Sequence, residues 1–132
     1  MRVMSTRVHA ILDYLVASWL IATPWLMHFS YILLPTSTLI GAGIAIIIYS
    51  LLTNYEFGIA KIMPIRLHLG LDFFIGILLI VSPWLFQFSD IIWKPHLLFG
   101  LVSIIASSIT KTSTTAENIL QNRLRRKIER SL

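Results

Sequence analysis

Four long runs of apolar residues, separated by short polar stretches, make up most of the chain. They cover residues 8–29, 33–52, 67–88 and 96–109. A helix that crosses a bilayer needs about 20 mainly apolar residues, with about 17 as the lower limit. The first three runs meet this requirement, whereas the fourth is short and carries hydroxyl residues near its end. We interpret all four as membrane helices and predict an all-α integral membrane protein.

The first and third runs begin with the same pattern of residues. The sequence RVHAILDY at 7–14 recurs 59 residues later as RLHLGLDF at 66–73, and TPWL at 23–26 recurs as SPWL at 82–85. Between 7–30 and 66–89, 11 of 24 positions are identical. Gly41 and Gly100 share the same offset, which supports the fourth run as the counterpart of the second. An internal repeat of this kind fixes the architecture.

The repeat predicts a four-helix bundle made of two tandem two-helix repeats, at about 7–52 and 66–111. The bundle would occupy residues 1–111, followed by a tail at 112–132. Because each repeat holds two spans, both repeats have the same topology, and a pseudo-two-fold axis along the membrane normal relates them. Small residues at equivalent places, Ala17 with Gly76 and Gly41 with Gly100, are expected to let the helices approach closely.

The composition supports an integral membrane protein, and the positions of the basic residues predict how the chain is oriented across the membrane. The chain is 56% hydrophobic and only 13% charged, with a mean hydropathy of +0.78 and no cysteine. A soluble domain carries about 25% charged residues. With four spans, 10 of the 11 Lys and Arg residues fall on one side, and Lys94 is the exception. The positive-inside rule therefore places both termini and the 53–66 linker in the cytoplasm.

Two Pro-Trp pairs lie near the outer ends of the first and third helices. Thr23 precedes Pro24, and Ser82 precedes Pro83, which is a helix N-cap and first-turn pattern. We therefore expect each helix to break there and restart as a short turn. A plain proline kink in a continuous helix is the alternative. Trp25 and Trp84 would then anchor the protein at the outer membrane interface.

The tail has a different character from the rest of the chain. Apolar residues recur every four positions among basic ones, at Ala116, Leu120, Leu124, Ile128 and Leu132. This pattern is typical of a basic amphipathic helix that lies on anionic lipid headgroups. We expect no nucleic-acid partner.

The paired R-x-H-x-x-x-D stretches and the Ser/Thr-Pro-Trp-Leu turns resemble the SPW-repeat family of small bacterial membrane proteins. The triplet is intact at residues 82–84, and Thr23 replaces its serine in the first copy. The resemblance covers about residues 7–111 and implies two-helix repeats in a bacterial inner membrane. It implies no activity and no functional residues.

Each repeat places one His and one Asp four residues apart inside a membrane helix. His9 with Asp13, and His68 with Asp72, would lie on one helix face, with each Asp about 9 Å into the membrane. The two-fold relation could bring both pairs to one inter-helix cleft that opens to the cytoplasm. Arg7 and Arg66, at the membrane edge, complete the candidate set. An intramembrane carboxylate is by default a candidate functional group.

Four interpretations of these pairs remain open. The first is structural: each Asp pairs with its own His, or with the Arg of the other repeat, and locks the bundle. The second is a pocket for a lipid headgroup, a quinone or another small molecule, lined by Tyr14, Trp19, Phe73 and Phe74. The third is a haem or metal site with His9 and His68 as ligands and the Asp residues behind them. The fourth is proton or ion movement along the His-Asp column.

The remaining features predict no chemistry. His28 and His96 should lie near the outer interface in contact with water. No nucleophile-base constellation or phosphate loop is present, so we expect no catalytic residues and no enzyme. We predict a small inner-membrane protein with a structural or binding role, which could act as an accessory subunit of a larger complex or as a homo-oligomer. We expect no cofactor, with haem or quinone as the alternative.

Overall fold

The chain folds into five helices. The computed structural model describes residues 2–131, apart from the side chain of Thr115. The helices are α1 (Thr6–Leu26), α2 (Leu33–Leu52), α3 (Ile65–Leu85), α4 (Lys94–Ile109) and α5 (Thr115–Glu129). Within the described residues there are two isolated bridges and no strand. The all-α prediction is therefore confirmed.

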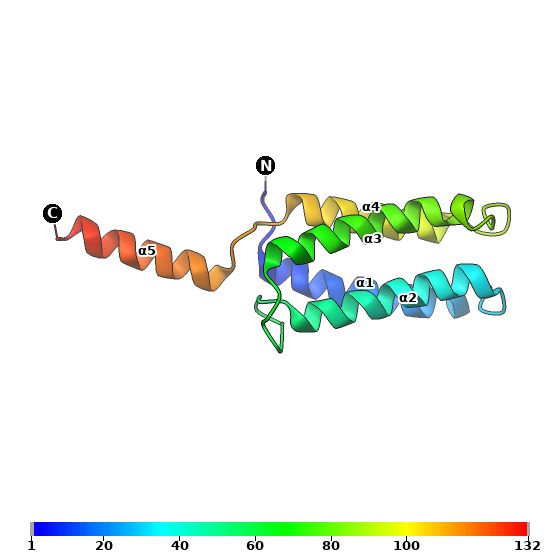
Figure 1. Cartoon of the computed structure of the whole chain (residues 1–132), viewed down its shortest axis with the longest axis horizontal. Helices are drawn as coiled ribbons and strands as arrows, with labels where there is room; N and C mark the ends of the chain where they lie inside the picture. The colour runs from blue at the N-terminus through cyan, green and yellow to red at the C-terminus, as the bar shows by residue number, and fades with distance from the viewer. Residues whose placement is uncertain (1, 132) are drawn as a thin grey trace.

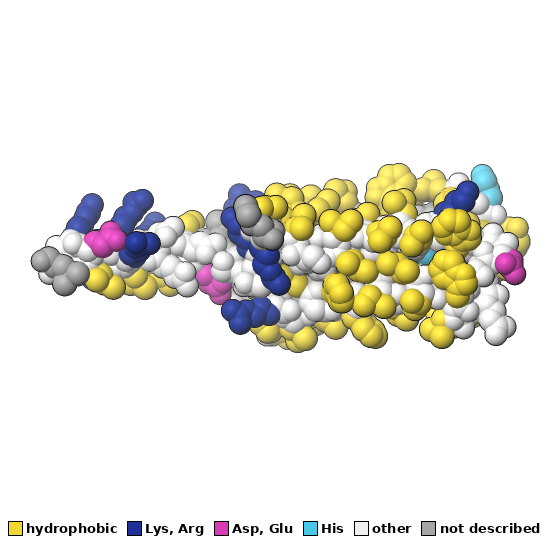
Figure 2. Space-filling view, turned by 90° about the horizontal axis from the view of Figure 1, so that it is seen from above, with side chains coloured by type: hydrophobic (Ala, Val, Ile, Leu, Met, Phe, Trp, Pro, Cys, Tyr) yellow, Lys and Arg dark blue, Asp and Glu magenta, His cyan; other side chains and the backbone are white. Residues whose placement is uncertain are grey.

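Helices α1–α4 form two antiparallel hairpins that lie side by side (Figure 1). Within a hairpin, α1 packs on α2 and α3 packs on α4; between the hairpins, α2 meets α3 and α1 meets α4. The N-terminal segment, the 53–64 linker and the connection to α5 all lie at the same end of the hairpins. We call this the basic end, because Lys and Arg side chains gather there and along α5 (Figure 2).

Two short backbone bridges close the basic end in equivalent ways. Met4, before α1, pairs with Thr110, after α4; Met63, before α3, pairs with Thr53, after α2. The first bridge joins the start of one hairpin to the end of the other, and the second joins the end of the first hairpin to the start of the next. The repeat symmetry therefore extends beyond the helices to the chain segments that connect them.

The two prolines lie inside continuous helices, so the expected break is wrong. Pro24 and Pro83 sit in the last turns of α1 and α3. A proline there removes only one helical hydrogen bond, and the helix continues for two more residues. The preceding hydroxyls do not cap a new helix; the Thr23 hydroxyl donates to the carbonyl of Trp19, 2.6 Å away. Both helices end just before left-handed residues, His28 (φ 57°) and Gln87 (φ 58°).

Close helix packing uses a different glycine of α2 from the one we expected. A Cβ on Gly100 would lie 2.6 Å from the carbonyl oxygen of Gly76, and a Cβ on Gly43 would lie 2.9 Å from that of Ala17. A Cβ on Gly41 would meet nothing within 4 Å. The counterpart of Gly100 is therefore Gly43, at an offset of 57, and not Gly41. The physical reason lies in the chain between the helices: Gly43 follows Leu26, the last residue of α1, by 17 positions, whereas Gly100 follows Leu85, the last residue of α3, by 15.

Much of the apolar surface of α1–α4 remains exposed. Only 33% of the most apolar stretch of α2, and 39% of that of α3, is buried in the fold. These two helices are long and apolar enough to cross a membrane, and α4 is a shorter apolar helix. Figure 2 shows apolar side chains covering the hairpins beyond the basic end. Such coverage is more than a water-soluble monomer normally exposes.

Helix α5 extends from the basic end and exposes nearly all its side chains (Figure 1). A capping box starts it: the Thr114 hydroxyl accepts from the backbone of Glu117, and the Glu117 carboxylate accepts from the backbone of Thr114. Its apolar residues Leu120, Leu124 and Ile128 are exposed, while Leu132, the last residue of the predicted stripe, lies outside the described residues. That α5 contacts anionic headgroups stays a prediction.

Candidate functional site

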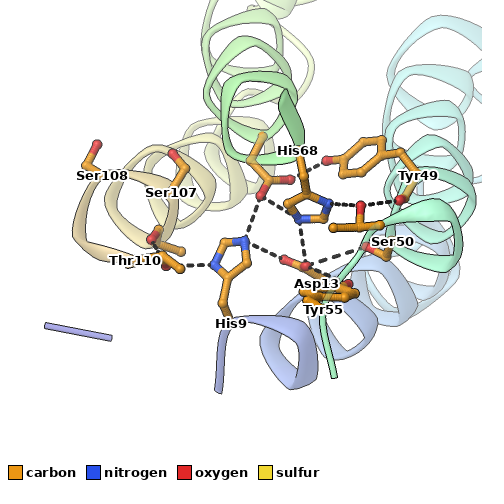
Figure 3. Close-up of polar contacts among 12 residues, drawn as sticks. His9, Asp13, Tyr49, Ser50, Tyr55, His68, Ser107, Ser108 and Thr110 are labelled. Carbon is orange, nitrogen blue, oxygen red and sulfur yellow. Dashed lines mark hydrogen bonds and ion pairs between the residues drawn. The ribbon is translucent and has the colours of Figure 1, made fainter. Parts of the chain in front are cut away.

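The two His-Asp pairs meet in one buried cluster near the basic end. His9 and Asp13 come from the first two turns of α1, and His68 and Asp72 come from the same turns of α3. Their relative exposures are 1%, 7%, 0% and 4%, in that order. Figure 3 shows His9, Asp13 and His68 pointing toward one another. The cluster is closed, and the expectation of a cleft open to the cytoplasm is therefore wrong.

The shortest contacts in this cluster join the two repeats. His9 Nε2 lies 2.8 Å from Asp72 Oδ2, and His68 Nε2 lies 3.0 Å from Asp13 Oδ2. The contacts within a helix are longer, 3.4 Å for His9–Asp13 and 3.1 Å for His68–Asp72. Each Asp therefore contacts both histidines, and its shortest contact is with the His of the other repeat.

Two threonines fix the direction in which each imidazole ring faces. The Thr110 hydroxyl donates to the carbonyl of Ala106 (2.5 Å), so its oxygen accepts from Nδ1–H of His9 (3.0 Å). In the same way the Thr53 hydroxyl donates to the carbonyl of Tyr49 (2.6 Å) and accepts from Nδ1–H of His68 (2.8 Å). Because each hydroxyl hydrogen is already committed, Nδ1 must be the donor. In both histidines, Nε2 faces the carboxylates.

Additional hydroxyl groups surround the carboxylates unequally. Tyr49 donates to Oδ1 of Asp72. Tyr55, from the linker, and Ser50 donate to Oδ2 of Asp13 over 3.2 and 3.4 Å. Burial raises the pKa of Tyr55 far above its ordinary value, so this phenol stays protonated and can donate to Asp13.

A small cavity marks where the two repeats differ. Ala106 holds the place in α4 that Tyr49 holds in α2, at the offset of 57. A cavity of about 10 Å³ lies there, lined in part by His9, Asp13, Asp72 and Ala106. That volume is about the minimum for one water molecule. A tyrosine of α2 therefore contacts Asp72, whereas the equivalent position of α4 leaves a cavity beside both aspartates.

The other candidate residues lie outside the cluster. Arg7 and Arg66 are exposed and pair with neither Asp. Tyr14 donates to the carbonyl of Phe57 over 3.1 Å. Trp19, Phe73 and Phe74 are 56%, 45% and 62% exposed, so they do not line a common pocket with the His-Asp pairs. Trp25 and Trp84 are similarly exposed, near the end opposite the basic end.

The haem alternative finds no support in this geometry. The rings of His9 and His68 meet edge to face, with their centroids 5.3 Å apart. Both Nε2 atoms are in contact with carboxylate oxygens, and the cavity beside them holds only about 10 Å³. A porphyrin between the two rings would have to displace both aspartates.

Sequence reasoning missed the residues that orient the histidines. Thr53 and Thr110 follow directly after α2 and α4 and share the offset of 57. This second offset is the signal that could have identified them as equivalent. Ser50 shares the same offset with Ser107 and could have been found in this way. Tyr49 and Tyr55 could not, because neither has a tyrosine counterpart in the second repeat.

The two remaining histidines differ from each other. His28 is exposed, as expected. His96 is fully buried, so the expectation that water solvates it is wrong; its Nε2 lies 3.2 Å from the carbonyl oxygen of Pro35. At the offset of 57, His96 takes the place of the buried Leu39 rather than that of Ser37.

Comparison with known proteins agrees with the repeat architecture. Residues 7–110 match the family model described as the SPW repeat domain, which covers both repeats and leaves out α5. No curated protein and no solved structure matches the chain. With α2 and α3 apolar enough to cross a bilayer, the match indicates a small membrane protein. The chain belongs to the SPW repeat domain family, as the resemblance of its two R-x-H-x-x-x-D stretches predicted.

Proposed function

We propose that this protein is a four-span structural protein of the bacterial inner membrane, in which the His-Asp cluster locks two tandem repeats into one bundle. The observation that carries the proposal is the exchange of partners between repeats, His9 with Asp72 and His68 with Asp13. Contacts within one repeat would stabilise only a hairpin. Contacts between repeats hold the two hairpins together.

The physical argument rests on the cost of buried charge. An ionisable group inside a membrane is expensive unless it is paired. Here two basic and two acidic groups lie together, and hydroxyls satisfy the remaining hydrogen-bonding atoms of the cluster. A fully satisfied polar network specifies one arrangement of the helices that carry it, because every other arrangement leaves a group unpaired.

A double-mutant cycle tests the lock. His9→Ala, Asp72→Ala and the double variant are compared with the parent for free energy of unfolding, in detergent with a chelator present. We expect a coupling energy of about 2–3 kcal/mol, at the upper end for residues in contact. The control pair His9→Ala with Asp90→Ala should be additive, since Asp90 is exposed at the opposite end. Additivity of both pairs would rule out a lock between the repeats.

We further propose that the basic end faces the cytoplasm. All Lys and Arg residues except Lys94 lie at or beyond it, and juxtamembrane basic residues favour the cytoplasmic side. The chain has no cysteine, so single cysteines can be introduced at the exposed positions Ala60 and Asp90. In intact cells, an impermeant thiol reagent should label Asp90→Cys and spare Ala60→Cys. Labelling of Ala60→Cys from outside would invert the orientation.

A further inference from the structure

The His-Asp cluster brings four potential metal ligands to one point. One atom from each of His9, Asp13, His68 and Asp72 lies within 4.8 Å of the other three. We propose that these residues bind one divalent transition-metal cation of the zinc type, through Nε2 of each His and one oxygen of each Asp. The proposal goes beyond the structural lock, and different measurements test the two.

The orientation of the imidazoles is the first argument. A His that binds a metal through Nε2 normally donates its Nδ1–H to a fixed acceptor, which holds the ring and sets the tautomer. Thr110 is that acceptor for His9, and Thr53 is that acceptor for His68. In both cases the threonine hydrogen is already committed to a backbone carbonyl. In the metal-free protein a proton lies in the contact between each Nε2 and its carboxylate. Binding of the ion releases these two protons to solvent, and each Nε2 then offers its lone pair to the ion between the carboxylates.

The spacing of the ligand atoms is the second argument. Zinc binds nitrogen and carboxylate ligands at about 2.0–2.1 Å in tetrahedral sites, which places the ligand atoms about 3.3 Å from one another. Oδ2 of Asp72 lies 2.8 and 3.1 Å from the two Nε2 atoms. Asp13 meets His68 through Oδ2 at 3.0 Å and His9 through Oδ1 at 3.4 Å. All four ligand atoms already lie within 4.8 Å of one another, so shifts of about 1 Å or less per atom bring them to tetrahedral spacing. A cavity of about 10 Å³, lined in part by His9, Asp13 and Asp72, lies beside the four residues and gives these side chains space to adjust.

Charge and ligand type select the class of ion. Two carboxylates and two neutral imidazoles carry a charge of −2, so a divalent cation makes this buried site neutral. A neutral site avoids the cost of an uncompensated buried charge. Mg²⁺ and Ca²⁺ prefer oxygen ligands alone, whereas two imidazoles and two carboxylates in a tetrahedral arrangement suit zinc.

Cobalt loading provides the test. The full chain, purified without a histidine tag and stripped with a chelator, is titrated with Co²⁺ and separately with Zn²⁺. We expect one ion per chain, the intense visible bands of tetrahedral Co²⁺, their loss on addition of Zn²⁺, and a higher thermal midpoint with Zn²⁺ but not with Mg²⁺. Absence of stoichiometric binding, or only the weak bands of octahedral Co²⁺, would overturn the proposal.

Variants of one ligand and of the threonines that orient the histidines show whether the ion sits in this cluster. The double variant Thr53→Val and Thr110→Val removes both acceptors, and should weaken metal affinity by about 10–100-fold. Thr23→Val is the matched control, because Thr23 is also buried and also bonds a carbonyl one turn earlier, but contacts no histidine. Its affinity should equal that of the parent. If His9→Gln and the double threonine variant both bind metal as the parent does, the ion sits elsewhere and the proposal is wrong.

The metal site and the lock are distinguished by the conditions of measurement. The coupling between His9 and Asp72 is measured with chelator, so it reports the metal-free contact alone. Binding stoichiometry and the cobalt spectrum report the ion alone. Strong coupling without stoichiometric metal binding would support the lock and overturn the metal site. Stoichiometric metal binding without coupling would support the metal site and overturn the lock.

Discussion

Asp72→Ala is expected to lower the free energy of unfolding by about 3–5 kcal/mol, the usual cost of removing one partner of a buried ion pair. Asp72 contacts His9 at 2.8 Å and His68 at 3.1 Å, and accepts from Tyr49. Removing its carboxylate leaves all three groups buried without that partner. Unfolding of the purified protein in detergent, followed by circular dichroism, measures the loss.

Two comparison variants make this result specific. Asp13→Ala should cost somewhat less than Asp72→Ala, because the shortest contact of Asp13 with a histidine is longer, 3.0 Å against 2.8 Å. Asp90→Ala, at an exposed position, should change stability by no more than about 0.5 kcal/mol. An Asp72→Ala protein as stable as the parent would contradict any stabilising role for the cluster.

Gly100→Ala is expected to destabilise the protein by about 1–3 kcal/mol, the typical cost of overpacking a tight contact. The added Cβ would lie 2.6 Å from both the Gly76 carbonyl oxygen and the Ile80 Cγ1. The isoleucine side chain can move, but the backbone carbonyl belongs to α3. The two helices must therefore separate, which the same unfolding measurement detects.

The matched controls are two glycines of α2, one in a tight position and one in an open position. Gly43→Ala should behave like Gly100→Ala, because its Cβ would lie 2.9 Å from the carbonyl of Ala17. Gly41→Ala should leave stability unchanged or slightly raised, since its Cβ would meet nothing within 4 Å. If Gly41→Ala is the harmful variant of α2 and Gly43→Ala is neutral, the offset of 57 between α2 and α4 is wrong.

The repeat and the apolar runs by themselves determined much of this protein's architecture. Four apolar runs, with Arg, His, Asp, Pro and Trp kept in step over 24 residues, are enough to predict four helices in two equivalent hairpins. The spacing of four residues places His and Asp on one face of each helix, and the cost of a carboxylate facing lipid directs that face inward. These conclusions depend on local periodicity and on the apolar character of the runs, which indicates a lipid environment. Both can be read directly from the sequence.

Only the tertiary structure decided which groups meet. Sequence spacing pairs His9 with Asp13, yet the closer partner is Asp72, 63 residues away. The contact of Thr110 with His9 spans 101 residues. It depends on a stretch of chain, from Leu85 to Gly100, that is two residues shorter than its counterpart from Leu26 to Gly43. The same shortening buries His96 and makes Gly43 the counterpart of Gly100. Such contacts depend on the register between helices, which packing across the bundle sets and which no local pattern in the chain encodes.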